Sequence, residues 1–140
     1  MENVTSVVPF LSVTDMERSV RYYVDGLEFT MKNKWVDGGK LRWCWLEKGN
    51  AALMLQEFWR DGHHSGRPDG KLGQGVSLVF QCQDALSVYR ELTSRGIEAW
   101  EPFVGNGLWN FSLTDPDDYR IEFASPTETP EETKLSELAG

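Results

Sequence analysis

The stretch Leu108–Phe123, LWNFSLTDPDDYRIEF, contains two runs of alternating apolar and polar residues joined by a tight turn. The turn, Asp115–Asp118, has an aspartate at its first corner and Pro116 presetting φ at the second, which is typical of a type I turn. Asp118 belongs to a residue type that tolerates the left-handed backbone of a bulge. The sequence therefore predicts a β-hairpin. Strand alternation places the Glu122 carboxylate on the opposite face from its two apolar neighbours.

The first half of the chain predicts a strand, a helix and three further strands. Residues 6–13 have strand character, and Thr14 and Glu17 have the spacing of a capping box at the start of a helix. Apolar residues recur at helical spacing as far as Gly26, which stands where a C-terminal cap is expected. Three strands should follow, at residues 29–35, 41–46 and 51–58.

The second half predicts the same order of elements after a glycine-rich segment. Residues 59–74 mix glycine and charges, as surface linkers do. Residues 75–82 then predict a strand, and Asp84 begins a helix that should end at Gly96. Three more strands are expected at residues 97–103, 108–113 and 119–124.

The two halves read as an internal repeat of βαβββ modules. Asp15 and Asp84 are 69 residues apart, and Gly26 and Gly96 are 70 apart, as one additional residue in the second helix would give. Each module has little core of its own, so we expect two curled sheets that share one domain around a cleft, and a homodimer. The expected fold is α+β. The single domain covers residues 1–126, divided into module 1 (1–58), the linker (59–74) and module 2 (75–126).

The rest of the chain, residues 127–140, is a polar tail. It contains proline and several acidic residues, and it is either disordered or forms a short terminal helix from Pro130 onward.

Composition limits the classes of partner. The formal net charge is −8 and the pI is about 4.7, which argues against nucleic acid and favours cationic or neutral ligands. The N-terminus has no basic region, and its apolar run is broken by Pro9 and Ser12, so neither a signal peptide nor a membrane span is predicted and a cytoplasmic location is expected. Cys44 and Cys82 lie in apolar contexts without a CxxC motif, which predicts two buried free thiols.

Aromatic residues are abundant, with six tryptophans in 140 residues. Large aromatic side chains fill cores, and they also line sites for planar ligands. We expect about half of the strand aromatics to be core and the rest to stack on a ligand. The aromatic candidates are Phe10, Trp43, Trp45, Trp59, Trp109 and Phe111.

The closing hairpin resembles that of the vicinal-oxygen-chelate superfamily, which includes glyoxalases, extradiol dioxygenases and bleomycin-resistance proteins. Its usual form reads DPDGYxxE, and here Asp118 stands where that pattern has glycine. The segment Ala51–Trp59, AALMLQEFW, resembles the glyoxalase pattern ALELTxxW. The resemblance covers nearly the whole chain and implies the paired two-module fold.

In metal-dependent members of that superfamily, four ligands, usually His, Gln or Glu, come from equivalent strands. The resemblance carries these positions to Val8, Met54, Ser77 and Glu122. One carboxylate among four cannot hold a divalent cation, so no metal and no other cofactor is expected. A two-residue slip would replace Met54 by Gln56 and still give a poor site.

Two histidines and one carboxylate are further candidates for a functional role. His63 and His64 lie in a glycine-rich loop, where adjacent side chains diverge, and are interpreted as solvated. Glu122 is either a surface carboxylate beside Arg120 or a partner for a cationic ligand group. No catalytic residue is expected, because no serine, cysteine or histidine stands in a nucleophile motif.

These observations favour a metal-free protein that binds a small molecule, resembles the bleomycin-resistance branch and sequesters an aromatic or cationic ligand. The alternatives are a glyoxalase- or dioxygenase-type enzyme with a displaced metal site and a structural or regulatory dimer without a ligand. The predicted ligand-binding residues are Phe10, Trp43, Trp45, Met54, Gln56, Trp59, Ser77, Trp109, Phe111 and Glu122.

Overall fold

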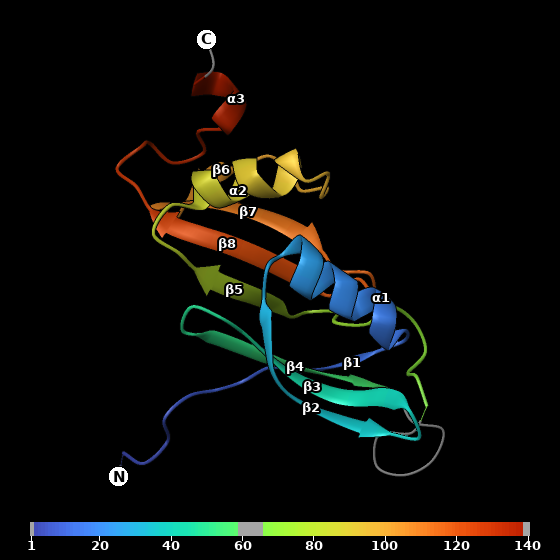
Figure 1. Ribbon diagram of the computed structural model, residues 1–140. Coiled ribbons are helices and arrows are strands. Elements are labelled where there is room, and N and C mark those ends of the chain that lie inside the picture. The colour runs from blue at the N-terminus through green and yellow to red at the C-terminus, as the bar shows by residue number, and fades with distance from the viewer. Residues whose placement is uncertain (1, 59–65, 139–140) are drawn as a thin grey trace. The chain divides into compact units, whose positions relative to one another are not determined.

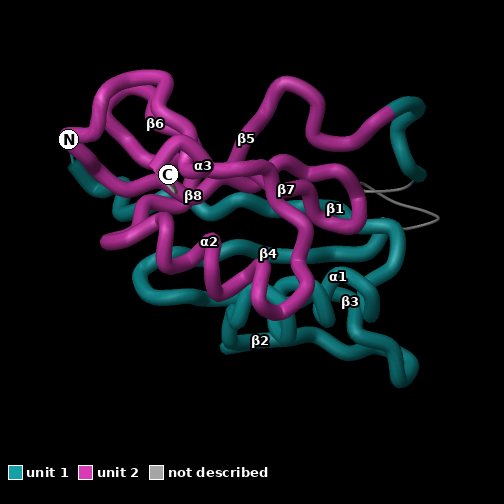
Figure 2. Tube along the Cα trace, turned by 90° about the horizontal axis from the view of Figure 1, so that it is seen from above, with its two compact units in different colours: residues 1–70 teal, residues 71–140 magenta. Residues whose placement is uncertain are grey.

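The computed structural model describes residues 2–58 and 66–138. The chain divides into two compact units, residues 1–70 and residues 71–140, coloured separately in Figure 2. Each unit contains one four-stranded mixed sheet with a helix between its first and second strands (Figure 1).

The sheet of unit 1 has the strand order β1-β4-β3-β2. β1 runs parallel to β4, and the two hairpin pairs, β2 with β3 and β3 with β4, are antiparallel. The strands are β1 (Phe10–Val13), β2 (Thr30–Asp37), β3 (Lys40–Lys48) and β4 (Ala51–Glu57).

The sheet of unit 2 repeats this topology in the order β5-β8-β7-β6, with β5 parallel to β8 and the other pairs antiparallel. Its strands are β5 (Ser77–Gln81), β6 (Phe103–Gly105), β7 (Leu108–Thr114) and β8 (Arg120–Pro126). The predicted α+β fold of two βαβββ modules is confirmed.

Aspartate side chains start both module helices. Asp15 precedes α1 (Met16–Val20) and accepts a hydrogen bond from the Arg18 backbone N–H, and Asp84 precedes α2 (Ala85–Ser94) in the same way. The predicted capping box was therefore wrong by one residue. Thr14 instead accepts a hydrogen bond from the Arg18 guanidinium.

The two helices end differently. α1 continues as the π-helix η1 (Arg21–Gly26), in which the Leu27 N–H donates to the Tyr22 carbonyl at 2.9 Å. Gly26 is thus the last residue of η1 and not a left-handed cap, because the wider turn delays the left-handed residue to Glu28, with φ 63°. In the second helix Gly96 does take this role, with φ 84°.

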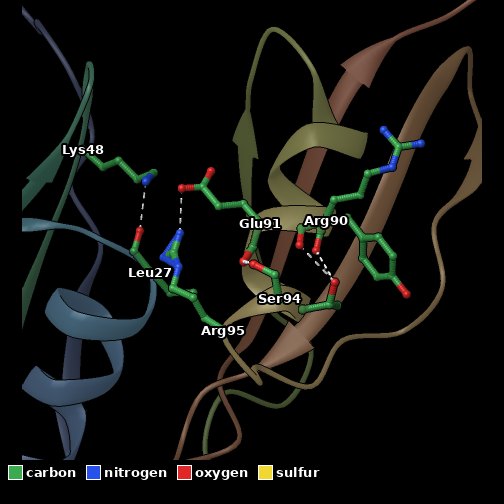
Figure 3. A network of polar contacts seen from close by, with 8 residues as sticks. Leu27, Lys48, Arg90, Glu91, Ser94 and Arg95 are labelled. Carbon is green, nitrogen blue, oxygen red and sulfur yellow. Dashed lines mark hydrogen bonds and ion pairs between the residues drawn. The ribbon is translucent and has the colours of Figure 1, made fainter.

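Side chains complete both helix ends (Figure 3). In unit 1, the Lys48 ammonium donates to the Leu27 carbonyl at 2.9 Å, which satisfies a carbonyl just beyond η1. In unit 2, Arg95 pairs with Glu91 at 2.8 Å, one turn apart along α2. Such an exposed pair contributes about 0.3–0.5 kcal/mol.

The core of unit 1 lies on one face of its sheet. α1 contacts β4, and Met16, Tyr23 and Leu27 are the large buried residues along the helical segment and its end. The sheet residues that are buried on this face alternate along their strands as a half-covered sheet requires. They are Leu11, Val13, Cys44, Leu46, Leu53 and Leu55.

The core of unit 2 is aromatic. α2 lies against β7 and β8 (Figure 1), and Tyr89 of α2 meets Phe111 edge-on, with ring centroids 5.3 Å apart. Phe111 stacks on Phe123 at 5.3 Å, and Phe123 stacks on Phe80 at 5.6 Å. Aromatic pairs of this kind contribute about 0.5–1.5 kcal/mol each beyond area burial.

Two predicted strands are shorter than expected. The N-terminal strand begins at Phe10 rather than at residue 6, and the strand predicted over residues 97–103 is regular only over Phe103–Gly105. Trp100, just before β6, still donates its backbone N–H to the Ser112 carbonyl at 2.9 Å. The alternation of apolar and polar residues does not show at which residue regular strand pairing begins.

The polar tail contains the short helix α3 (Leu135–Leu138), which begins five residues after Pro130. It pairs with the edge of β6, since the Val104 N–H donates to the Thr133 carbonyl and Phe103 forms a bridge with Lys134. The Glu131 carboxylate accepts hydrogen bonds from the Asn106 and Gly107 N–H groups of the β6–β7 turn, at 2.7 and 2.9 Å. Among the described residues, no helix is long and apolar enough to cross a membrane.

The β7–β8 hairpin has the predicted turn. The Asp118 N–H donates to the Asp115 carbonyl at 3.0 Å, and Asp118 is left-handed with φ 70°. Asp115 is buried, and its Oδ1 accepts from the N–H groups of Asp117 and Tyr119 at 2.8 and 2.9 Å. The first aspartate therefore organises the turn that the sequence indicated.

This turn predicts an order of stability at position 118. Asp118 is exposed and left-handed, a conformation that costs an alanine about 1 kcal/mol and a glycine almost nothing. We expect Asp118→Ala to lower the unfolding free energy by about 1 kcal/mol and Asp118→Gly to leave it unchanged or raise it by less than about 1 kcal/mol. Urea denaturation measures both, and an alanine variant as stable as wild type would contradict the left-handed turn.

Candidate functional site

The face of the unit 1 sheet opposite its core is lined by aromatic and polar side chains, and we call it the first open face. Strand pairing sets its rows, because residues opposite each other on neighbouring strands point to the same side. One row joins Phe10, Met54 and Trp45, and the next joins Ser12, Gln56, Trp43 and Trp35.

Five of the predicted ligand-binding residues share this face. Because their strands pair directly, the structure places Phe10, Trp43, Trp45, Met54 and Gln56 on one sheet surface. Phe10 is 44% exposed. Sidedness on β3 and β4 could be read from alternation, which explains why these residues were found together.

Two further residues of the first open face were missed. Trp35 pairs with Trp43 and is 47% exposed. The Glu47 carboxylate accepts a hydrogen bond from the Trp45 indole N–H at 2.7 Å, which fixes the orientation of that indole. The alternation of side chains along β2 indicates Trp35 as a residue of this face. The two-residue spacing between Trp45 and Glu47 indicates that these two side chains share one face of β3.

Gln56 carries an unsatisfied donor. Its side chain is only 9% exposed, and its Nε2 has no hydrogen-bond partner among the residues that the structure describes. A buried polar group without a partner costs about 1–3 kcal/mol, and native proteins satisfy such groups with water or a ligand. The Gln56 amide therefore offers a donor beside the Trp43 indole.

The corresponding face of the unit 2 sheet, the second open face, is polar. Ser77, Arg120, Glu122 and Ser112 lie on it through the pairing of β5, β8 and β7. Arg120 pairs with Glu122 at 3.1 Å and donates to the Ser112 hydroxyl at 3.0 Å. The Glu122 carboxylate is thus held by Arg120, and Ser77 lies at the edge of the sheet.

Trp109 and Phe111 do not lie on an open face, which corrects the prediction for these two. They are 6% and 0% exposed, and the register puts them on the covered side with Phe123. Along β7, apolar side chains alternate with polar ones such as Asn110. The polar side chains of this strand lie on the second open face, and the apolar ones adjacent to them in sequence lie on the covered face. Trp59, and the loop residues His63 and His64, fall outside the described residues.

The four positions that correspond to metal ligands in the resembling superfamily do not form a metal site. Phe10 lies five residues before the helix-capping Asp15 and pairs with Met54. Val79 lies five residues before the helix-capping Asp84 and pairs with Glu122, so Met54 and Glu122 occupy equivalent places in the two sheets. A thioether and one arginine-bound carboxylate do not fit a hard or borderline cation. Within residues 2–58 and 66–138, no three His, Cys, Asp or Glu side chains gather as metal ligands do.

Both thiols are protonated at neutral pH. Burial raises the pKa of Cys44 to about 11, with a smaller opposing effect from the Leu55 backbone, and burial also raises the pKa of Cys82. A thiolate nucleophile needs the opposite shift. Neither cysteine therefore supplies a nucleophile.

Paired βαβββ modules, each with one mixed four-stranded sheet, define the structural class of this chain. The family model described as Glyoxalase/Bleomycin resistance protein/Dioxygenase superfamily matches residues 4–123. The chain belongs to this superfamily. A comparison with curated protein sequences gave no match.

Solved structures with the same fold have diverse descriptions. An antibiotic-binding protein from Streptomyces sp. CB03234 is 19% identical with a TM-score of 0.63, and the alignment covers 88% of this chain and 98% of that one. A bleomycin-binding protein from Streptomyces verticillus, complexed with copper(II)-bleomycin, is 16% identical with a TM-score of 0.66 and coverage of 88% and 97%. A lactoylglutathione lyase from Agrobacterium tumefaciens is 17% identical with a TM-score of 0.65 and coverage of 89% and 96%.

The unsatisfied Gln56 amide gives a stability prediction. Gln56→Met keeps the volume and removes a buried donor, so we expect the unfolding free energy to stay unchanged or to rise by up to about 2 kcal/mol. Leu55→Ala, one residue away on the covered face, is the matched control and should lower it by about 2–5 kcal/mol. Urea denaturation measures both. Destabilisation of Gln56→Met by more than about 1.5 kcal/mol would mean that the amide has a partner in the folded protein.

Proposed function

We propose that this chain is a small-molecule binding protein that sequesters a planar, aromatic ligand on the first open face without changing it chemically. The observation that carries the proposal is the row Gln56–Trp43–Trp35. In this row a buried donor that has no partner among the described residues is next to the Trp43 indole, and Trp35 follows on the next strand. Of the four positions that correspond to metal ligands in this superfamily, Val8, Met54 and Ser77 carry other residue types and only Glu122 keeps a ligand type, which supports binding over metal-dependent catalysis.

Stacking supplies the affinity. Trp35, Trp43, Trp45 and Phe10 lie on neighbouring strands, so a planar ligand laid on the sheet contacts several rings at once. Each aromatic pair contributes about 0.5–1.5 kcal/mol beyond area burial, and several pairs together with burial of the ligand give micromolar affinity. A carbonyl or other acceptor on the ligand would satisfy the Gln56 amide.

A positive charge on the ligand suits this face. Glu47 is already held next to Trp45 by the indole hydrogen bond, so its carboxylate is oriented without further entropic cost. Glu122 lies in unit 2 and stays an independent proposed contact for a cationic ligand group, in competition with Arg120. The net charge of −8 favours the approach of cations.

The similar structures agree with this class of function. Two of the three described above bind an antibiotic or bleomycin according to their descriptions. At 16–19% identity they share the fold, and the assignment of an organic ligand to this chain depends on its own aromatic row.

Tryptophan emission tests the proposal. Titration with bleomycin, a planar cationic glycopeptide, should change the emission in a saturable way, and Trp45→Leu should weaken binding about two- to tenfold with little loss of stability. Trp109→Leu is the control, because it should lower the unfolding free energy by about 1–3 kcal/mol and leave affinity unchanged. No saturable change with bleomycin or a panel of other planar cations would contradict the proposal.

A second candidate is an enzyme of the glyoxalase or dioxygenase type with a displaced metal site, which the similarity to a lactoylglutathione lyase favours. Metal analysis of the protein purified without chelator separates the two functions. The binding proposal predicts less than about 0.1 equivalent of Zn, Ni, Mn or Fe and unchanged bleomycin affinity after EDTA, since stacking needs no metal. A stoichiometric metal would favour the enzyme.

The homodimer and the cytoplasmic location stay predictions. Sedimentation at micromolar concentration checks the first, and a monomer would remove it.

A further inference from the structure

We propose a second binding site, selective for a small aromatic carboxylate, in a cavity of unit 2 whose lining includes none of the residues of the first open face. The cavity has a volume of about 420 Å³. Its lining combines two aromatic rings, two cationic groups, a hydroxyl and a carboxylate. These residues are Trp100, Glu101, Phe103, Ser112, Arg120 and Lys134.

The aromatic walls are exposed. Trp100 is 59% exposed and Phe103 is 41% exposed. Large aromatic side chains that share an exposed concavity mark a binding surface more often than a scattered surface residue does. A flat ring placed in this cavity would cover both.

Arg120 is held in a fixed position. Its Nε donates to Glu122 at 3.1 Å, one of its terminal nitrogens donates to the Ser112 hydroxyl at 3.0 Å, and its guanidinium carbon lies 5.8 Å from the Trp100 ring centroid. A guanidinium has five N–H donors, so others remain for a ligand. A planar fork held over an indole matches a carboxylate bound edge-on.

The tail brings in the second cation. Lys134 forms the bridge with Phe103, and the flanking residues are fixed by the bonds from the Val104 N–H to the Thr133 carbonyl at 2.8 Å and from the Leu135 N–H to the Pro102 carbonyl at 2.9 Å. The backbone thus places the Lys134 side chain at the rim of the cavity, while its side chain remains exposed. The tail is therefore part of the site.

The formal charges at the cavity balance, because the cationic groups of Arg120 and Lys134 are matched by the carboxylates of Glu101 and Glu122. Arg120 and its partner Glu122 cancel, and Glu101, the lining carboxylate, already accepts from the Ser136 hydroxyl at 2.8 Å. Lys134 adds a second, exposed cationic group to the lining. Since the whole chain has a net charge of −8, which repels anions at long range, selectivity for a carboxylate must come from Arg120 and Lys134 at short range.

Calorimetric titration with 1-naphthoate and with its neutral amide, 1-naphthamide, tests the site. Wild type should bind naphthoate about fivefold or more tightly than naphthamide, because only the carboxylate pairs with the cations. Lys134→Gln should weaken naphthoate binding about fivefold and leave naphthamide unchanged. Lys71→Gln, an exposed lysine of the same unit outside the cavity, is the matched control and should change neither.

Trp100→Leu gives a second readout, because it removes a ring that both compounds should contact and should weaken both to a similar extent. Trp45→Leu, on the first open face, should change neither, so a failure of the proposed function leaves this result intact. Equal affinity of wild type for the two compounds, undetectable naphthoate binding at millimolar concentration, or an unchanged affinity in Lys134→Gln would overturn the proposal.

Discussion

The parallel pairing of β1 with β4 decides which side chains this protein presents to a ligand. Phe10 opposite Met54 and Ser12 opposite Gln56 place the intervening Leu11 and Leu55 in the core. A slip by one residue would bury Phe10 and expose the leucines, because side chains alternate with a period of two. The apolar covered face therefore enforces the register, and the register assembles the first open face. The β5–β8 pair does the same in unit 2, where Ile121 and Phe123 are buried and Arg120 and Glu122 are left on the open side.

The open faces carry features that folding alone does not favour. The Gln56 amide, whose nitrogen has no partner within residues 2–58 and 66–138, and the half-exposed rings of Trp35 and Trp100 each cost stability or solubility in a free protein. Their cost is small beside the apolar cores. Among the described residues, five buried leucines lie in unit 1, and three buried leucines lie with a group of aromatic rings in unit 2. Local departures of this kind concentrate at functional surfaces, which is the physical reason for assigning ligands to both faces.

The fold was predictable from the sequence because two signals agreed. Turn chemistry at Asp115–Asp118 and the repeated order of capped helix and strands both indicated paired βαβββ modules, and both were confirmed. The helix ends were less accessible. The π-helix before Leu27 arises from hydrogen bonding that residue types do not encode, so the glycine at position 26 was interpreted as a cap that the structure places at Glu28.

Side-chain sidedness limited the prediction of the site. On β3 alternation predicted that Trp43 and Trp45 share one strand face, and on β4 it predicted the same for Met54 and Gln56; the strand pairing brings the two pairs together on one sheet surface. On β7 aromatic residues were read as ligand-facing, whereas Trp109 and Phe111 fill the core under α2. Lys134 joins Trp100 in the lining of one cavity because the tail pairs with β6. This pairing is a long-range contact, and the sequence of a polar, proline-containing tail gives no local signal for it.

The central claim is that the first open face binds a planar organic ligand through its tryptophans. The most direct measurement is a two-dimensional ¹⁵N–¹H NMR spectrum of the six indole N–H groups, assigned by single substitutions and recorded during titration with bleomycin. The account predicts saturable shifts or broadening of the Trp35, Trp43 and Trp45 resonances, and an unchanged Trp109 resonance. A ligand that binds while these three resonances stay in place, or that perturbs Trp109 most, would contradict it.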